Sequence, residues 1–249
     1  MSCQLDHSEY IREAENASTA VLLIHGIAGT PAHFRQLIPV IPTDWSIYNL
    51  LLDGHGGAVR DFSATSMKKW KAQVAARLEQ LLNRYEAVYL VAHSMGTLFS
   101  IQAAIAHPDQ IKGLFLLAVP TRPWVRFTTM CTCLRVSFGN IKPTDTSAIA
   151  MQNATSICLT SRLWAYIGWI PRMLELLSEI RKTRKLLPGL TVPTMSFQSK
   201  VDELVSARSI RDMETHPVIQ NTVLHHSGHF AYGDEDMKLL QTRLKRLLK

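Results

Sequence analysis

The chain carries a serine between small residues, directly after an apolar stretch and directly before a helix-prone one. Residues 87–93 (Ala-Val-Tyr-Leu-Val-Ala-His) are mostly apolar and β-prone, Ser94 comes close behind them, and residues 98–106 favour a helix. This order predicts a strand, a sharp turn and a helix, with Ser94 exposed at the turn. The first N–H groups of the helix would point at whatever Ser94 attacks. Ser94 is therefore a candidate nucleophile; the alternative is a buried serine in an ordinary strand–helix turn.

Residues 92–96 (Ala-His-Ser-Met-Gly) resemble the Gly-x-Ser-x-Gly motif of the α/β-hydrolase superfamily, in particular that of the small bacterial carboxylesterases and monoacylglycerol lipases. Ala92 departs from the motif by one methyl group. The resemblance implies a mostly parallel, doubly wound sheet with a helical cap inserted late in the chain. It also implies a serine hydrolase that needs neither a cofactor nor a metal ion. Ser94 argues against the dehalogenase branch, which has aspartate at this position.

The resemblance implies an oxyanion hole made of two backbone N–H groups. A His-Gly turn after an early strand supplies one donor in the family, and residues 23–31 (Leu-Ile-His-Gly-Ile-Ala-Gly-Thr-Pro) contain such a turn. The implied donors are the amides of Ile27 and Met95. Two amides aimed at one oxygen would stabilise the negative charge that develops there. We expect His25 to hydrogen-bond within this loop and to transfer no proton.

The resemblance also assigns the acid and the base that a serine nucleophile needs. The family keeps its acid a few residues past the penultimate strand, where Asp202 lies, and its base in a Ser-Gly-His pattern, which selects His229 over the two histidines at 225 and 226. Glu203 is expected to point away from the site. The chain order Ser94, Asp202, His229 is the family's order.

Apolar periodicity supports this fold class. Strands are expected at 18–24, 45–52, 87–93, 113–119, 191–198 and 218–224, and helices after Pro31, after Ser66, after the serine turn and at 234–248. Strands that alternate with helices predict a parallel sheet. The alternation stops between residues 120 and 188, so we expect a core made of residues 1–120 and 189–249 with a helical cap at 121–188. Aromatic side chains of the cap could line an acyl pocket.

The net charge of +7 is concentrated in the expected cap. Residues 121–190 hold ten Lys and Arg against three Asp and Glu, so the remainder of the chain is balanced. This excess could bring the cap into transient contact with anionic lipid surfaces, or it could simply be a solvated helical face. No nucleic-acid-binding motif accompanies it, so nucleic acid is not expected as a partner.

Composition narrows the remaining classes. No apolar run approaches the ~20 residues that span a bilayer, and the first residues have neither the basic nor the apolar part of a secretory signal. Four cysteines without a disulfide or metal-ligand spacing favour a reducing cytoplasm and no metal site. We expect a small-molecule ester as substrate. Thioester, lactone, aryl-ester or C–C hydrolysis by the same residues stays open, as does a non-catalytic ligand-binding protein. The oligomeric state cannot be read from the sequence.

Overall fold

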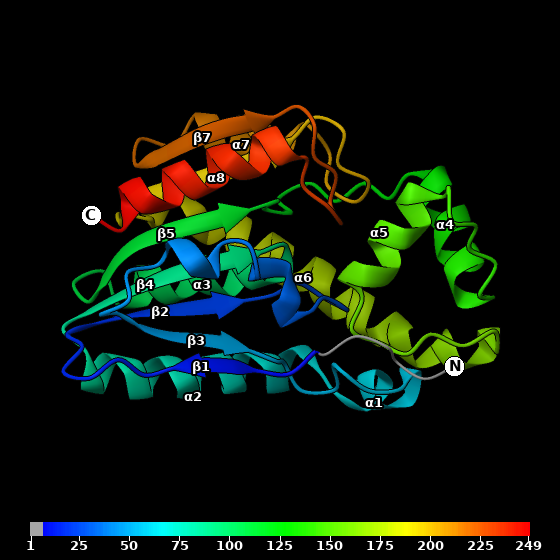
Figure 1. Ribbon diagram of the computed structural model, residues 1–249, viewed down its shortest axis with the longest axis horizontal. Helices are drawn as coiled ribbons and strands as arrows, with labels where there is room; N and C mark the ends of the chain where they lie inside the picture. The colour runs from blue at the N-terminus through cyan, green and yellow to red at the C-terminus, as the bar shows by residue number, and fades with distance from the viewer. Residues whose placement is uncertain (1–6) are drawn as a thin grey trace.

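The computed structural model describes residues 7–249, so the expectations about Cys3 and the first six residues lie outside the described part. Its centre is a seven-stranded sheet in the order β1-β3-β2-β4-β5-β6-β7 (Figure 1). Only β1 runs antiparallel to its neighbour; the other strands are parallel. The strands are β1 (Tyr10–Arg12), β2 (Thr19–Ile24), β3 (Ser46–Leu50), β4 (Ala87–His93), β5 (Ile111–Leu117), β6 (Thr194–Ser199) and β7 (Ile219–Leu224).

Helices cover both faces of this sheet. The helices are α1 (Val59–Ala64), α2 (Met67–Arg84), α3 (Met95–Ala106), α4 (Phe127–Ser137), α5 (Thr146–Ala154), α6 (Ile170–Leu186), α7 (Ser209–Glu214) and α8 (Asp234–Leu247). Short 3₁₀ helices are η1 (Pro31–Phe34), η2 (Ile38–Val40), η3 (Leu163–Trp169) and η4 (Leu187–Gly189). Within β2, Leu22 and Ile24 pack toward α2 and α3, whereas Val21 and Leu23 pack toward η1 and α8. Burial on both faces explains the unbroken apolar run of this strand.

Helix α2 shows how local signals place an element beside the sheet. The Ser66 hydroxyl accepts the backbone N–H of Lys69 at 3.2 Å and so satisfies a free donor of the first turn. The buried residues of α2 recur at helical spacing, and the last of them are Leu81 and Leu82. The expected cap residue and apolar face are both present.

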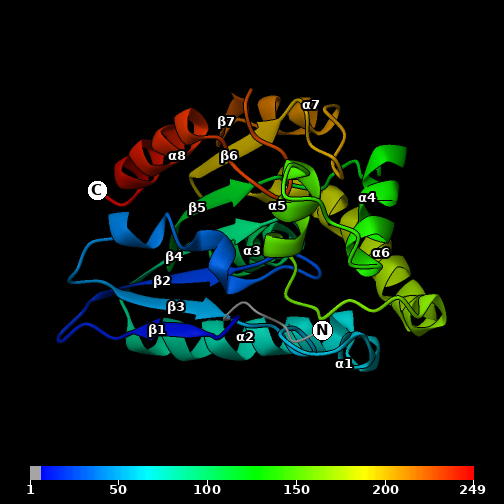
Figure 2. The same ribbon diagram turned by 45° about the vertical axis from the view of Figure 1, so that its right-hand side comes forward.

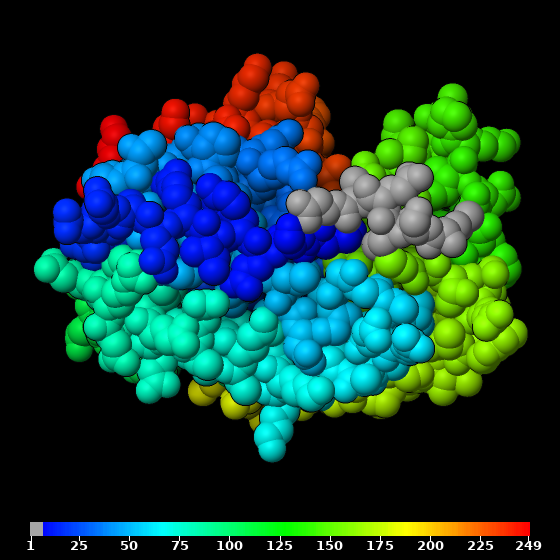
Figure 3. Space-filling view, turned by 60° about the horizontal axis from the view of Figure 1, so that its bottom comes forward, coloured from blue at the N-terminus to red at the C-terminus, as the bar shows by residue number. Residues whose placement is uncertain are grey.

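The segment between β5 and β6, residues 118–193, contains α4, α5, η3, α6 and η4. Helices α4 and α5 and the 3₁₀ helix η3 lie beyond the carboxyl ends of the parallel strands (Figure 2), and α6 runs back along α3. The segment is fastened to α1, which lies beside η3 (Figure 3, cyan beside yellow-green). The Trp169 ring packs on Phe62 with centroids 4.6 Å apart, and the amide of Cys158 donates to the Gly57 carbonyl. This β5–β6 segment therefore faces the end of the sheet where parallel α/β folds place their ligands.

The mostly parallel, doubly wound sheet is as predicted, and each expected strand is present with small differences at its ends. Strand β1 and helix α1 were not predicted. The helix expected after Pro31 is instead two 3₁₀ turns, η1 and η2, separated by a break. Pro39 lies in the second of these and lacks the N–H that a continuous α-helix would need there. In the part of the chain that the structure describes, no helix combines the length and apolar composition needed to cross a bilayer.

Candidate active site

Ser94 occupies the tight turn between β4 and α3. Its backbone has φ 50° and ψ −119°, a conformation that costs free energy for a residue with a Cβ. The turn is held by the Ser94 amide, which donates to the Leu117 carbonyl, and by Thr97, whose hydroxyl donates to the Ser94 carbonyl. Strand β4 thus ends abruptly and α3 begins at the next residue, as the motif predicts.

Of the two predicted donors, Met95 follows Ser94 directly, and Ile27 follows Gly26 in the loop that packs against this turn. The loop at Gly26 passes so close that a Cβ on Gly26 would lie 2.8 Å from the Cβ of Ser94. Met95 opens α3, so its N–H has no intrahelical acceptor. Among the backbone hydrogen bonds of residues 7–249 that are not internal to a helix or to the sheet, none has the amide of Ile27 or of Met95 as its donor. Both donors are thus uncommitted in the loop and turn that meet at Ser94.

His25 fixes the shape of the Gly26 loop. Its Nε2 accepts the Leu52 amide at 3.1 Å, which leaves the proton on Nδ1, 2.8 Å from the Gly26 carbonyl. The side chain is fully buried, and desolvation holds its pKa well below the usual value. A neutral histidine with both nitrogens bonded to main chain agrees with the loop-ordering role expected for it.

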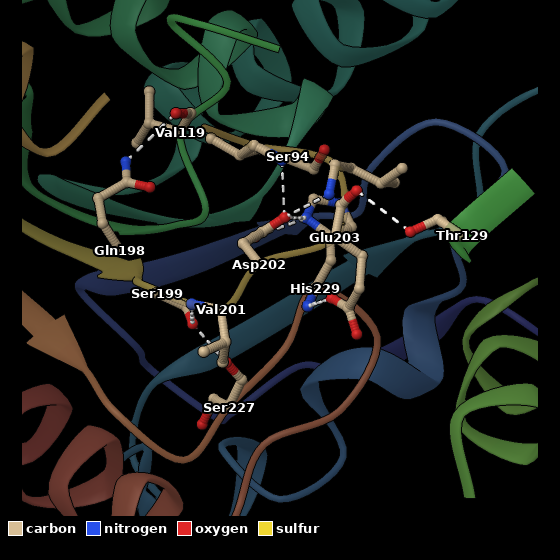
Figure 4. Close-up of polar contacts among 12 residues, drawn as sticks. Ser94, Val119, Thr129, Gln198, Ser199, Val201, Asp202, Glu203, Ser227 and His229 are labelled. Atoms are coloured by element: carbon tan, nitrogen blue, oxygen red, sulfur yellow. Dashed lines mark hydrogen bonds and ion pairs between the residues drawn. The ribbon is translucent and has the colours of Figure 1, made fainter. Parts of the chain in front are cut away.

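Asp202 and His229 come from the loops after β6 and β7 and are in direct contact (Figure 4). His229 Nδ1 donates to Asp202 at 2.9 Å and 3.1 Å from the two carboxylate oxygens. Asp202 is oriented in turn by the amides of Leu204 and Val205, which both donate to its Oδ1 at 2.7 Å. Both side chains are almost wholly buried, so little water competes with this contact.

The Asp202 carboxylate makes His229 a stronger base. Burial by itself lowers the pKa of His229, but the Asp202 carboxylate outweighs it, and Glu203 adds to the effect, so the pKa of His229 is raised. Burial raises the pKa of Asp202, and the charge and hydrogen bond of His229 lower it below its usual value overall. Asp202 is therefore ionised at neutral pH and holds the proton of His229 on Nδ1, leaving Nε2 as the basic atom.

Two further histidines border this pair and were not assigned a role from the sequence. The His93 ring lies 4.7 Å from that of His229 and 3.9 Å from that of His33, measured between centroids. Burial keeps the pKa of His33 at about 3 and that of His93 well below 6.5, so both are neutral. His93 could have been found from the sequence because it directly precedes Ser94 in the motif. His33 could not, because it reaches the site through a contact between segments far apart in the sequence.

An apolar cavity of about 590 Å³ adjoins these residues. His93 and His229 form part of its wall, together with Ile27 from the Gly26 loop and side chains of α4, α5, η3 and α6. Among the described residues, no Asp, Glu, Lys or Arg lines it. The cavity has the size and character of a small-molecule site.

Asp212 and His55 lie elsewhere and take no part in the pair of Asp202 and His229. Asp212 is paired with Arg122 on the surface of α7. His55 is buried against Phe62 and Trp70 and bonds to main-chain carbonyls. Glu203 was expected to point away from the site, but this was wrong: its carboxylate accepts the His229 backbone N–H. Ser94 Oγ has no hydrogen-bond partner among residues 7–249. No cluster of side chains suited to a metal ion is found among these residues either.

Comparison with known proteins agrees with this fold. A family model described as "alpha/beta hydrolase fold" matches residues 19–130. The chain is 32% identical over 97 residues to a thermostable monoacylglycerol lipase of Bacillus sp. (strain H-257), a match that spans 39% of each chain. It is 21% identical over 240 residues to a pimeloyl-[acyl-carrier protein] methyl ester esterase of Aeromonas hydrophila, covering 89% of this chain and 92% of that one. The family model thus matches less than half of this chain, the lipase match covers less than half of each chain, and the esterase match covers almost all of both.

Solved structures share the whole architecture at low identity. A solved structure from work on LipS and LipT, two metagenome-derived lipolytic enzymes, superposes with a TM-score of 0.71 at 17% identity, covering 97% of both chains. A monoacylglycerol lipase of Paleococcus ferrophilus superposes with a TM-score of 0.67 at 16% identity, over 97% of this chain and 98% of that one. At these identities the likeness establishes the fold alone.

Proposed function

We propose that this chain, which has the α/β-hydrolase fold, is a serine hydrolase of that superfamily and cleaves carboxylic esters through an acyl-enzyme intermediate. The observation that carries the proposal is the buried hydrogen bond from His229 to Asp202, next to the strained turn of Ser94 and at the wall of an apolar cavity. The names of the lipase and esterase relatives support ester chemistry in general.

In the first half-reaction the Ser94 hydroxyl attacks the ester carbonyl carbon while His229 Nε2 takes its proton. Asp202 stabilises the imidazolium that forms and holds the ring by Nδ1. The carbonyl oxygen becomes negative and accepts hydrogen bonds from the amides of Ile27 and Met95, each worth roughly 3 kcal/mol at the transition state. Collapse of the tetrahedral intermediate breaks the C–O bond, and His229 gives its proton to the leaving alcohol.

The second half-reaction repeats these steps with water. His229 takes a proton from water as the water oxygen attacks the acyl carbon, and the oxyanion again forms between the amides of Ile27 and Met95. The ester bond to Ser94 then breaks, and His229 returns the proton to the serine oxygen. The products are a carboxylic acid and the regenerated enzyme.

We propose that residues 121–188 act as a cap and that the cavity beneath them receives the acyl chain. Met130 and Leu134 of α4 and Tyr166 and Trp169 of η3 contribute to its wall. No fixed charge lines the wall, and the nearby His25, His33 and His93 are neutral, so an acyl chain that ends in a carboxylate would lose its hydration without gaining a partner. The site therefore favours uncharged short or medium acyl chains.

The test is hydrolysis of p-nitrophenyl esters of increasing acyl length by the wild type and by Ser94→Ala. We expect a burst of p-nitrophenol, a preference for apolar over ω-carboxylated acyl groups, and a loss of several orders of magnitude in kcat for Ser94→Ala with an unchanged unfolding transition. Equal rates for the two proteins would overturn the assignment of Ser94. A protein that binds these esters without releasing p-nitrophenol would instead be a ligand-binding member of the superfamily.

We further propose that the cap contacts anionic lipid surfaces. Phe127, Met130, Leu134 and Phe138 are exposed along one face of α4, and Leu163, Ile167, Ile170 and Leu174 are exposed along η3 and α6. Met130, Leu134 and Leu163 also line the cavity, so both faces continue into it. Several basic side chains of this segment have no acid partner among residues 7–249, among them Arg126, Lys142 and Arg162. Apolar side chains beside unpaired cations fit an anionic bilayer.

Co-sedimentation with vesicles tests this contact. We expect binding to phosphatidylcholine vesicles that contain phosphatidylglycerol, weaker binding to phosphatidylcholine alone, and loss of binding in Phe127→Ser/Ile170→Ser. Ile11→Ser, which alters an exposed residue of β1 far from the cap, is the matched control and should bind like the wild type. Equal binding by all three proteins, or none by the wild type, would contradict the proposed contact.

A further inference from the structure

The carboxylate of Glu203 sits against the main chain of the loop that carries His229. Its Oε2 accepts the His229 backbone N–H (Figure 4). Its Oε1 lies where a side chain on Gly228 would begin, since a Cβ there would be 2.5 Å from it. Gly228 does not have a positive φ, so backbone conformation does not require a glycine. A Cβ at Gly228 would instead displace the Glu203 carboxylate from this position.

We propose that Glu203 is a positioning residue for His229, holding the histidine loop so that the imidazole meets Asp202, and that Gly228 is present to admit its carboxylate. The proposal rests on the proposed function, because it concerns the base of that reaction. It couples two adjacent acids to one histidine through different atoms: Asp202 bonds the ring and Glu203 bonds the backbone.

Glu203 is itself held at both ends. Its carbonyl accepts the Arg126 amide at 3.1 Å and the Thr129 hydroxyl at 3.3 Å, both from the start of α4. The neighbouring Leu204 carbonyl accepts the Trp124 amide, and Pro123 bridges to Val205. The backbone of Glu203 is therefore fixed against the entrance to the β5–β6 segment, and the side chain reaches from this anchor to the histidine loop.

The rest of that loop is fixed on its other side. The Ser227 hydroxyl donates to Asp236 of α8 at 2.6 Å, and the His226 amide donates to the same carboxylate oxygen at 2.8 Å. These bonds hold residues 226 and 227 but not residue 229. Among residues 7–249, Glu203 is the hydrogen-bond acceptor of the His229 amide. Removing it should loosen the backbone at His229 while the start of the loop stays in place.

Charge gives the proposal a second readout. The titratable groups that face His229 are Asp202, Glu203, His93 and His33, with Tyr232 beyond His33. His33 and His93 are neutral, so the two acids dominate. Burial lowers the pKa of His229, and Asp202 raises it. The Glu203 charge raises this pKa further. A Glu203→Gln change keeps an oxygen acceptor and removes only this charge.

The first experiment compares Glu203→Gln with Glu203→Leu. Glu203→Gln should keep most of kcat and move the acidic limb of kcat/KM to lower pH, because a less stabilised imidazolium loses its proton earlier. Glu203→Leu should lower kcat roughly 10- to 100-fold at the pH optimum with little change in KM, as expected when a base is misplaced. Glu235→Gln makes the same charge change at an exposed site of α8 and should leave both quantities unaltered.

The second experiment tests the space at Gly228. Gly228→Ala and Glu203→Ala should each lower kcat, and Glu203→Ala/Gly228→Ala should lose less than the two single losses combined, because the clash is then absent. Additive losses would show that the two residues act independently. Unfolding transitions of all variants separate loss of activity from loss of folded protein.

The outcomes distinguish this inference from the function on which it rests. If the wild type does not hydrolyse esters, the proposed function fails. If the wild type is active while Glu203→Gln keeps the wild-type acidic limb and Glu203→Leu keeps the wild-type kcat, the function stands and the role of Glu203 is overturned. If Glu203→Leu does not fold, the pH profile of Glu203→Gln and the Gly228 comparison still decide.

Discussion

The main-chain oxygen of Ile24 lies where a side chain on Gly96 would begin, far inside the 3.0 Å that real Cβ contacts respect. Helix α3 therefore approaches β2 more closely than any other residue at position 96 would allow. This approach brings the end of β2, which leads into the Gly26 loop, against the first turn of α3. The small residue of the serine motif is thus a packing requirement for bringing the two predicted oxyanion donors together.

We expect Gly96→Ala to destabilise the protein by about 3 kcal/mol or more, because backbone rather than a flexible side chain must move. Gly189→Ala is the matched control, since a Cβ at Gly189 meets nothing within 4 Å. Urea unfolding of both variants measures the effect. A similar small change in both would mean that α3 can shift away from β2 at little cost.

The backbone of Ser94 predicts a gain in stability when its Cβ is removed. Ser94→Gly should raise the free energy of unfolding by about 1 kcal/mol relative to Ser94→Ala, since glycine adopts φ near 50° without strain. Both variants lack the hydroxyl and should be equally inactive. Chemical denaturation of the pair measures the strain, and equal midpoints would show that the turn stores none.

The histidine–aspartate pair predicts the position of the acidic limb of kcat/KM. Although burial lowers it, the pKa of His229 is raised overall by Asp202, so activity should fall below a pH that lies above the 6.5 of an ordinary histidine. In Asp202→Asn the limb should move to lower pH and kcat should fall by ~10⁴. A pH–rate profile of the two proteins checks both. A wild-type limb well below pH 6.5 would be inconsistent with the charged pair.

Buried neutral histidines predict acid sensitivity of the fold. Burial lowers the pKa of His55 to about 4, against about 6.5 in an unfolded chain. Between these values only the unfolded chain takes up the proton, so the stability present above pH 6.5 is lost as the pH falls toward 4, by up to about 1.4 kcal/mol per unit for each such histidine.

His55→Asn should therefore show a shallower fall in the free energy of unfolding between pH 6.5 and pH 4, even if it is less stable throughout. Asparagine keeps a donor for the Leu52 carbonyl that His55 Nδ1 now bonds. His226→Asn removes an exposed histidine and should keep the wild-type slope. Parallel slopes for all three proteins would contradict a neutral, buried His55.

The strands and the serine turn could be predicted from the sequence because each depends on a local pattern of residues. The apolar run of β4 and the small residues around Ser94 predict the strand, the turn and the start of α3, and the structure has them at the expected residues. The short edge strand β1 and helix α1 lack such a signal. Tyr10 is exposed, and β1 is held by pairing with β3 rather than by apolar alternation.

The candidate site likewise contains residues that the sequence predicted and contacts that it did not. The family pattern pointed to Asp202 and His229, which the structure brings into contact across 27 positions of sequence. It gave no sign of the neighbours of His229. The stacking of His33 on His93 and the contact of Glu203 with the His229 amide depend on how loops from distant elements pack. An acid directly after Asp202, together with a glycine directly before His229, was the available signal for the second contact.

The central claim is that Ser94 is a nucleophile activated by His229. Its most direct test is reaction with a fluorophosphonate, followed by mass spectrometry of the digested protein. We expect one adduct, on the peptide that contains Ser94, absent in Ser94→Ala and formed orders of magnitude more slowly in His229→Ala. An adduct on another serine, or ester hydrolysis that persists in Ser94→Ala, would contradict the claim.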